Sequence, residues 1–257
     1  MLRHVRRLAT SATGALPDLV GTAPSHRSYI FLHTPQPPSE YPARYATPLQ
    51  RALLLRTVKW GGSVNFSWSP EQPAYPIAAS GDQAYHLTAF SRNGRLALEG
   101  VRMENVEEVA KRLQEHAEGG AIAVKKDEDV HLYVCTHGSR DCRCGDTGGA
   151  VVRALQEELK RRNAQDPNGP SSRVKVAETA HVGGHKYAAN ILVYPHGEWL
   201  GYVEPEDVPA VLDAVFKRPT RPASASDPPL CPPHWRGRMG LAKDEQIELF
   251  QATAQAA

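Results

Sequence analysis

The stretch that decides the fold is residues 131–162, HLYVCTHGSRDCRCGDTGGAVVRALQEELKRR. Its first five residues, His131–Cys135, are mostly apolar and predict a short strand. A glycine-rich loop follows. Beyond it, apolar residues recur at helical spacing and predict an amphipathic helix through about Arg162; they are Val151, Val152, Leu155 and Leu159. A buried strand that leads into a helix across such a loop is typical of an α/β fold.

The chain beyond this helix continues with a strand, a hairpin and a second helix. Arg173–Thr179 alternates valines with charged residues, as a half-buried strand does. Asn190–Tyr194 and Glu198–Val203 flank Pro195-His196-Gly197, which predicts a hairpin. The closing helix presents one apolar face, made of Val208, Val211, Leu212 and Val215.

The first half of the chain repeats this order. The expected segments are a strand at Tyr29–His33, a helix at Pro48–Lys59, a strand at Ser63–Ser69, hairpin strands at Tyr85–Phe90 and Arg95–Leu98, and a helix carrying Val106, Val109, Ala110 and Leu113. Asn93-Gly94 is a strong hairpin signal, and Asn105 is the predicted N-cap of the last helix. Strand, helix, strand, hairpin and helix is the order of a thioredoxin-like unit. We therefore predict an α/β protein with two tandem thioredoxin-like domains, in which mixed sheets are flanked by helices.

The predicted domain organisation has four parts. Residues 1–26 are a leader, 27–118 an N-terminal thioredoxin-like domain without cysteine, 121–218 the domain with the cysteine-rich loop, and 219–257 a proline-rich linker and C-terminal strap. The leader carries Arg3, Arg6 and Arg7 and no acid before Asp18. This composition is typical of a mitochondrial transit peptide. The alternative is a disordered basic tail on a cytoplasmic protein.

Composition excludes several classes of protein. The 257 residues carry a formal net charge of +2, and no basic stripe alternates with aromatic residues, so nucleic-acid binding is not expected. No apolar run is long enough to span a bilayer. Four cysteines in a chain of this length do not make a disulfide framework, and are better interpreted individually as ligands, reactive thiols or buried apolar residues.

Cysteine and histidine usage separates the two halves. Cys135 ends a predicted strand, and Cys144 lies nine positions on, in the loop before the helix. His181 ends the next predicted strand, and His185 follows four positions later across Gly183-Gly184. Because both strand ends lie at one end of the sheet in a thioredoxin-like unit, we expect the four side chains to form one metal or metal-cluster site. Glycines in these loops would let the backbone approach an inorganic core closely.

The ligand set alone leaves two metals open. Two cysteines and two histidines suit tetrahedral zinc. The same residue types also suit a 2Fe–2S cluster with mixed ligands. The eight residues between Cys135 and Cys144 exceed the two to four, roughly, of a zinc knuckle. A loop that holds a larger core fits this spacing better, but spacing does not decide between the two.

Three segments, CTHGSRDCRCG, HVGGHKYAAN and WRGRMGL, resemble the sucrase/ferredoxin-like family of thioredoxin-like ferredoxins, over roughly residues 27–250. The resemblance implies a 2Fe–2S cluster in the second half, with Cys135, Cys144, His181 and His185 at the positions of the ligands. The basic leader favours the mitochondrial branch of the family, in the matrix or the intermembrane space. The chain departs from the pattern at Cys142, which is a possible alternative ligand in the same loop.

These observations favour an electron-transfer or redox-sensing protein in mitochondrial redox homeostasis, with an unidentified redox partner protein. An electron carrier is favoured over an enzyme with its own substrate. A thiol–disulfide oxidoreductase is the first alternative, although Cys142 and Cys144 form a Cys-x-Cys and not the Cys-x-x-Cys of thioredoxin. A zinc-stabilised interaction module is the second.

Overall fold

The computed structural model describes residues 18–72, 83–120 and 128–256. The predicted leader therefore falls largely outside the described residues. The strands are β1 (Ser28–His33), β2 (Gly62–Trp68), β3 (Tyr85–Ser91), β4 (Gly94–Val101), β5 (Val130–Cys135), β6 (Val174–Thr179), β7 (Ile191–Tyr194), β8 (Glu198–Leu200) and β9 (Trp235–Arg238). The α-helices are α1 (Pro48–Thr57), α2 (Val106–Glu118), α3 (Cys142–Gln165), α4 (Val208–Phe216) and α5 (Lys243–Ala256).

The strands form one mixed sheet in the order β4-β3-β1-β2-β6-β5-β7-β8-β9. Within each half, the first two strands are parallel, the third strand is antiparallel to the first, and the fourth strand is antiparallel to the third. The predicted mixed α/β architecture is thus confirmed, with the same strand order in both halves. In the sheet, the halves join where β2 pairs with β6 over two residue pairs, Ser67 with Thr179 and Trp68 with Glu178. The two predicted domains therefore share one sheet, and their separation into independent units stays a prediction.

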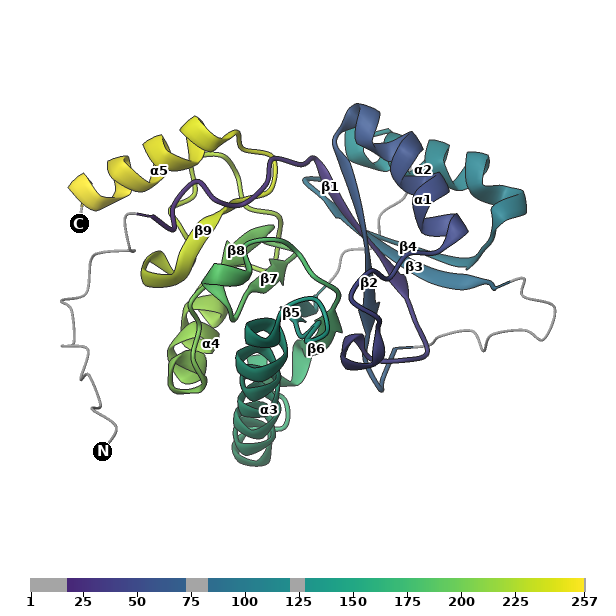
Figure 1. Ribbon diagram of the computed structural model, residues 1–257. Helices are drawn as coiled ribbons and strands as arrows, with labels where there is room; N and C mark the ends of the chain where they lie inside the picture. The colour runs from purple at the N-terminus through teal and green to yellow at the C-terminus, as the bar shows by residue number, and fades with distance from the viewer. Residues whose placement is uncertain (1–17, 73–82, 121–127, 257) are drawn as a thin grey trace.

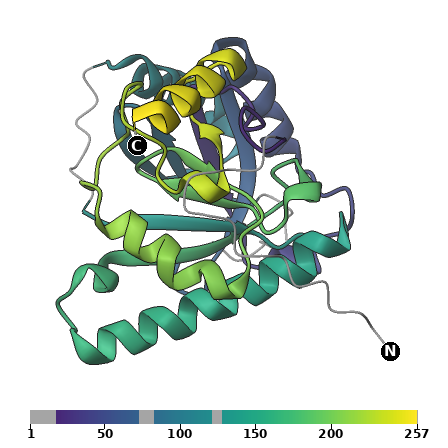
Figure 2. The same ribbon diagram turned by 90° about the vertical axis from the view of Figure 1, so that its left-hand side faces the viewer.

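Each half has helices on one face of its strands. α1 and α2 cover β1–β4, while α3 and α4 lie side by side over β5–β8 (Figures 1 and 2). Alternation along the strands explains this packing: Leu132 and Val134 of β5 point to α3 and α4, as Ile30 and Leu32 of β1 belong to the core with α1 and α2. Every residue of β1 and of β5 is buried, because the opposite face is covered as well.

An aromatic core joins the two halves on that opposite face. The Phe31 ring of β1 stacks on the Tyr133 ring of β5 at 3.7 Å between centroids, and Phe90 of β3 stacks on Tyr194 of β7 at 4.3 Å. Offset or stacked aromatic pairs add about 0.5–1.5 kcal/mol each beyond their buried area. The same cluster includes Cys135 and Cys144. The halves are therefore held together by a core that reaches the candidate site.

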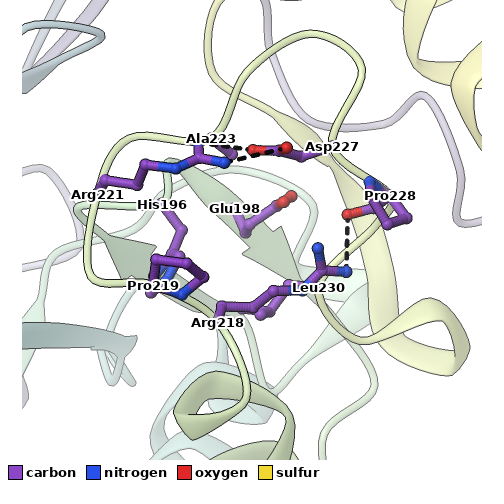
Figure 3. Close-up of a pocket in the computed structure, with 9 residues that line it drawn as sticks. All are labelled: His196, Glu198, Arg218, Pro219, Arg221, Ala223, Asp227, Pro228 and Leu230. Atoms are coloured by element: carbon purple, nitrogen blue, oxygen red, sulfur yellow. Dashed lines mark hydrogen bonds and ion pairs between the residues drawn. The ribbon is translucent and has the colours of Figure 1, made fainter.

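The C-terminal segment packs as a strap on the second half. Its strand β9 pairs with β8. Arg238 of β9 forms a buried ion pair with Glu198 of β8, with an Nε–Oε1 distance of 2.9 Å. Trp235 donates its indole N–H to the other Glu198 oxygen. Figure 3 shows Glu198 in a small pocket that the Arg221–Asp227 ion pair, at 2.7 Å, borders on one side. Because Arg238 and Glu198 are both buried, removal of either side chain would leave the charge of the other without a partner.

The described part of the predicted leader belongs to this folded body. Leu19 and Ala23 are buried, and the backbone N–H groups of Thr22 and Ala23 lie against the carbonyl of Arg236 in β9. The folded chain therefore begins by residue 18, before the predicted boundary at residue 27. No helix of the described residues has the length and apolar character to cross a bilayer.

One local expectation was wrong, and a second was right in the position of the N-cap residue but not in its side-chain hydrogen bond. α3 begins at Cys142, so Cys144 and the glycines that follow it lie inside the helix and not in a loop. Asn105 does precede α2, but its side chain makes no cap to that helix and instead accepts from the N–H of Arg102. In the first case a tertiary contact, described below, stabilises a helical turn that glycine content alone disfavours.

Candidate metal centre

The two cysteines come from the end of β5 and the first turn of α3. Asp141 is the N-cap of α3, and its Oδ1 accepts from the N–H of Arg143 at 3.1 Å. Gly148 lets the helix lie directly on the end of the strand, because a Cβ there would be 2.1 Å from the carbonyl oxygen of Cys135. This contact sets where Cys144, one turn earlier on α3, lies relative to Cys135.

The two histidines flank a turn that follows β6. Gly183 and Gly184 have φ angles of +85° and +70°, a backbone region that side-chain-bearing residues rarely adopt. The two glycines therefore reverse the chain between His181 and His185. His185 begins a short 3₁₀ turn, His185–Tyr187, and is exposed, whereas His181 is half-buried.

The structure brings three of the four predicted residues together. One ligand atom from each of Cys135, Cys144 and His181 lies within 4.8 Å of the others. The Cys144 sulfur is 3.7 Å from Nδ1 of His181. His185 lies beside this group, with its ring centroid 5.6 Å from that of His181, but its Nδ1 faces Asp141 Oδ2 at 3.7 Å. Cys142, the alternative ligand, is exposed and outside the group.

The two buried thiols are coupled. The Cys144 thiol donates to the Cys135 sulfur, which lowers the pKa of Cys135, and the backbone N–H groups of Val182 and His137 act in the same direction. The same hydrogen bond and burial raise the pKa of Cys144. Cys135 is therefore the more acidic thiol of the pair, and backbone N–H groups stabilise a negative charge on its sulfur.

Asp141 serves both sides of the candidate centre. Its hydrogen bonds with Arg143, with smaller contributions that include His185, lower the pKa of Asp141 to about 2. The carboxylate is therefore ionised at neutral pH, where it both caps α3 and faces Nδ1 of His185. A carboxylate beside one imidazole nitrogen is a common means of fixing the tautomer of a metal-binding histidine.

Arg236 of the strap makes hydrogen bonds that fix the turn between the two histidines. This buried guanidinium donates to the carbonyl oxygens of Gly183, at 3.3 Å, and Thr22, at 2.9 Å, and to Asn190 Oδ1 at 2.6 Å. It also lies over the ring of Tyr187 at 4.9 Å. Burial lowers the pKa of Arg236 to about 10, so it stays charged at neutral pH.

His137 ties the first half to the same turn. Its Nε2 lies 3.0 Å from the carbonyl of Pro42, and its Nδ1 accepts from the N–H of His181 at 3.4 Å. A neutral imidazole with its proton on Nε2 satisfies both contacts. His137 is two positions after Cys135 in the sequence, but its contact with the first half has no signal there.

Arg236 and Asn190 were missed by sequence reasoning. Arg236 lies in WRGRMGL, one of the three segments that resemble the family, and this resemblance is the sequence signal that points to it.

The family comparison covers both halves. The model of the family described as Sucrase/ferredoxin-like matches residues 19–237. The chain therefore belongs to the sucrase/ferredoxin-like family, which confirms the resemblance noted from the three segments.

Two curated relatives and one solved structure are similar over shorter stretches. Altered inheritance of mitochondria protein 32 from Meyerozyma guilliermondii is 41% identical over 93 residues, 35% of this chain and 31% of that protein. Actin patches distal protein 1 from Saccharomyces cerevisiae is 33% identical over 109 residues, 39% of this chain and 34% of that protein. The matched stretches span about a third of these relatives. A thioredoxin-like [2Fe-2S] ferredoxin from Aquifex aeolicus is 22% identical over 35% of this chain and 81% of its own, with a TM-score of 0.29, too low to support an argument.

Proposed function

We propose that this chain holds a 2Fe–2S cluster through Cys135, Cys144, His181 and His185, and that it acts as a one-electron carrier or redox sensor. The observation that carries the proposal is the convergence of two buried thiols and one imidazole within 4.8 Å, from the end of β5, the first turn of α3 and the segment after β6. Membership of the sucrase/ferredoxin-like family supports iron–sulfur chemistry over zinc, where residue types and spacing alone leave both open.

The residues present fit such a cluster. Cys135 already receives backbone N–H groups of the kind that stabilise an anionic sulfur. The turn at Gly183-Gly184 leaves its backbone free of side chains between the two histidines. When bound, a cluster with thiolate and imidazole ligands would accept and release single electrons, at a potential set by its ligands, its hydrogen bonds and its exposure to solvent.

The role proposed for each neighbouring residue follows from its contacts. Asp141 would hold Nδ1 of His185, which leaves Nε2 as the ligand atom. His137 would orient His181 through the backbone N–H of that residue. Arg236 would keep the histidine turn in place and bring a buried positive charge close to an anionic centre.

One geometric feature also favours the thiol–disulfide alternative. Cys135 and Cys144 are free, buried and hydrogen-bonded to each other, so oxidation could join them. Such a disulfide would consume both proposed thiolate ligands. Metal content and thiol state of the purified protein therefore distinguish the two functions.

The test is metal and sulfide analysis of the full chain, purified without oxygen, together with its visible absorption. We expect a red-brown protein with about two irons and two sulfides per chain. Cys135→Ser and Cys144→Ser should lose the colour, and Cys142→Ser, in the same segment but exposed, is the matched control that should keep it. In His181→Ala and His185→Ala, nitrogen couplings in the electron paramagnetic resonance spectrum of the reduced protein should diminish.

Two results would overturn this proposal. A colourless protein with one zinc per chain would favour the interaction module. Loss of the cluster in Cys142→Ser, with retention in Cys144→Ser, would replace the ligand.

The proposed location is the mitochondrion. The basic, acid-poor residues 1–17 and the name of the Meyerozyma relative support it. Residues 1–26 fused to a fluorescent protein should direct it to mitochondria, and a fusion with Arg3, Arg6 and Arg7 changed to Gln should stay in the cytoplasm. Cytoplasmic fluorescence of the unmodified fusion would contradict the proposal. Affinity capture from mitochondria with the cluster intact would identify the redox partner protein.

A further inference from the structure

An open cavity of about 350 Å³ lies at the seam between the two halves, next to the candidate metal centre. It is lined by the β2 residues Ser63–Phe66 and by residues 180–182, which follow β6. These segments adjoin the short pairing of β2 with β6, and the side-chain amide of Asn65 donates to the carbonyl oxygen of Ala180 at 3.2 Å. A volume of this size is at the lower end of the range, roughly 300–1,000 Å³, of small-molecule sites.

The residues around the cavity combine positive charge with aromatic surface. Arg44 lies in the segment before α1, and Arg140 lies in the loop after β5; both side chains are exposed. Among the described residues, neither arginine forms an ion pair, and no aspartate or glutamate lines the cavity. Four aromatic side chains line it, of which Tyr45 is half-buried and Tyr29, Phe66 and Trp199 are buried.

We propose that this cavity binds a small planar anion, a molecule with an aromatic ring system and a phosphate or carboxylate group. The ring would lie against Tyr45, the aromatic side chain of the lining that is not fully buried, and the anionic group would pair with Arg44 and Arg140. Arginine is suited to this role because its planar fork matches phosphate and carboxylate oxygens. A concave site of this volume favours a small molecule over a protein surface, which would need a much larger contact area.

The proposed anion site consists of the residues that line the cavity and does not require a bound cluster. His181 links the two, because it lines the cavity and its Nδ1 is 3.7 Å from the Cys144 sulfur. If both proposals hold, a bound molecule would contact one of the cluster ligands. A chain that contained zinc would still bind the planar anion, so the two proposals fail separately.

The test uses flavin mononucleotide and riboflavin, which share a planar ring and differ by a phosphate. Equilibrium dialysis against the full-length protein as purified, with flavin measured in the protein-free chamber, avoids interference from a coloured cofactor. We expect flavin mononucleotide to bind about tenfold more tightly than riboflavin, since two exposed guanidinium–phosphate pairs contribute modestly. Inorganic phosphate alone should compete weakly.

Matched variants locate the site. Arg44→Gln with Arg140→Gln should bring the affinity for flavin mononucleotide down to that for riboflavin. Arg112→Gln, an equally exposed arginine on α2 outside the cavity, should leave it unchanged. Ser63→Trp should fill the cavity and weaken binding of both flavins, with its urea unfolding midpoint measured to check the fold.

Several outcomes would overturn the proposal. They are absence of flavin mononucleotide binding, equal binding of the two flavins, competition by inorganic phosphate as strong as by flavin mononucleotide, an Arg112→Gln effect as large as that of the double variant, or a folded Ser63→Trp protein that binds as before.

Discussion

Gly148→Ala tests the contact that brings helix α3 onto the end of β5. An added Cβ would lie 2.1 Å from the carbonyl oxygen of Cys135 and 3.1 Å from its carbonyl carbon. Both are backbone atoms, so no flexible side chain can yield. An ordinary contact needs about 3.4 Å or more, so the helix and strand would have to separate by roughly 1 Å.

The expected cost combines two opposing effects. Alanine is better than glycine in a helix by about 1 kcal/mol. Overpacking at a rigid contact costs about 1–3 kcal/mol, and more where backbone must move. We therefore expect a net loss of about 1–2 kcal/mol in the free energy of unfolding. Cys144 is one turn earlier on the same helix, so its sulfur should also move away from Cys135 and His181.

Gly149→Ala is the matched control, one residue further along the helix. The nearest atom to its added Cβ is Nη1 of Arg153 at 3.5 Å, the far end of a flexible side chain. This variant should be neutral or stabilised by up to about 1 kcal/mol. Urea unfolding gives the stability of both variants, and iron content per chain gives the state of the centre. Equal stability and equal iron in the two variants would refute this account of Gly148.

Three further predictions concern residues outside that contact. Glu198→Ala should cost about 3–5 kcal/mol in unfolding free energy, because it leaves the buried guanidinium of Arg238 without its carboxylate. Asp213→Ala breaks a more exposed ion pair with Arg162 of α3 and should cost under about 1 kcal/mol. Similar losses in the two variants would contradict this expectation. Burial lowers the pKa of His26 to about 4, so between that pH and about 6.5 the unfolded chain binds more protons than the folded one, and stability is lost as the pH falls. From pH 7 to pH 5 the wild type should lose about 2 kcal/mol more unfolding free energy than His26→Phe. Parallel curves of stability against pH for the two proteins would exclude His26 as the cause. Arg236→Lys keeps the charge but loses the planar fork that holds the histidine turn. Iron content per folded chain should fall, and the urea midpoint should fall as well because buried acceptors lose their donors. Unchanged iron content would exclude Arg236 from the support of the site.

The sequence predicted most local elements because their signals are local. The two β-α-β-hairpin-α runs follow from strand alternation, helical spacing and turn residues such as Asn93-Gly94, and the structure has each of them. The failures occur where a distant contact competes. Glycine propensity predicted a loop before Val151, yet α3 begins at Cys142, because Asp141 caps it and Gly148 lets it pack on β5.

The candidate site divides in the same way. Cys135, Cys144 and His181 were identified from residue type and from strands that end at the same edge, and the structure brings them together. Arg236, Asn190 and the contact of His137 with the first half could not be found in this way. Their partners lie on segments distant in sequence, and a hydrogen bond between such segments leaves no periodic pattern in either.

The sequence by itself therefore determined the element order, the repeated half and the cysteine–histidine set, since these depend on neighbouring residues and on the period of each backbone. Only the tertiary structure decided that the halves share one sheet through two residue pairs, that the Phe31–Tyr133 and Phe90–Tyr194 stacks join them, and that a cavity opens beside His181. These features arise from how the two halves of the sheet meet. Burial on both faces of β1 and β5 makes their sequences apolar without indicating which segment covers each face.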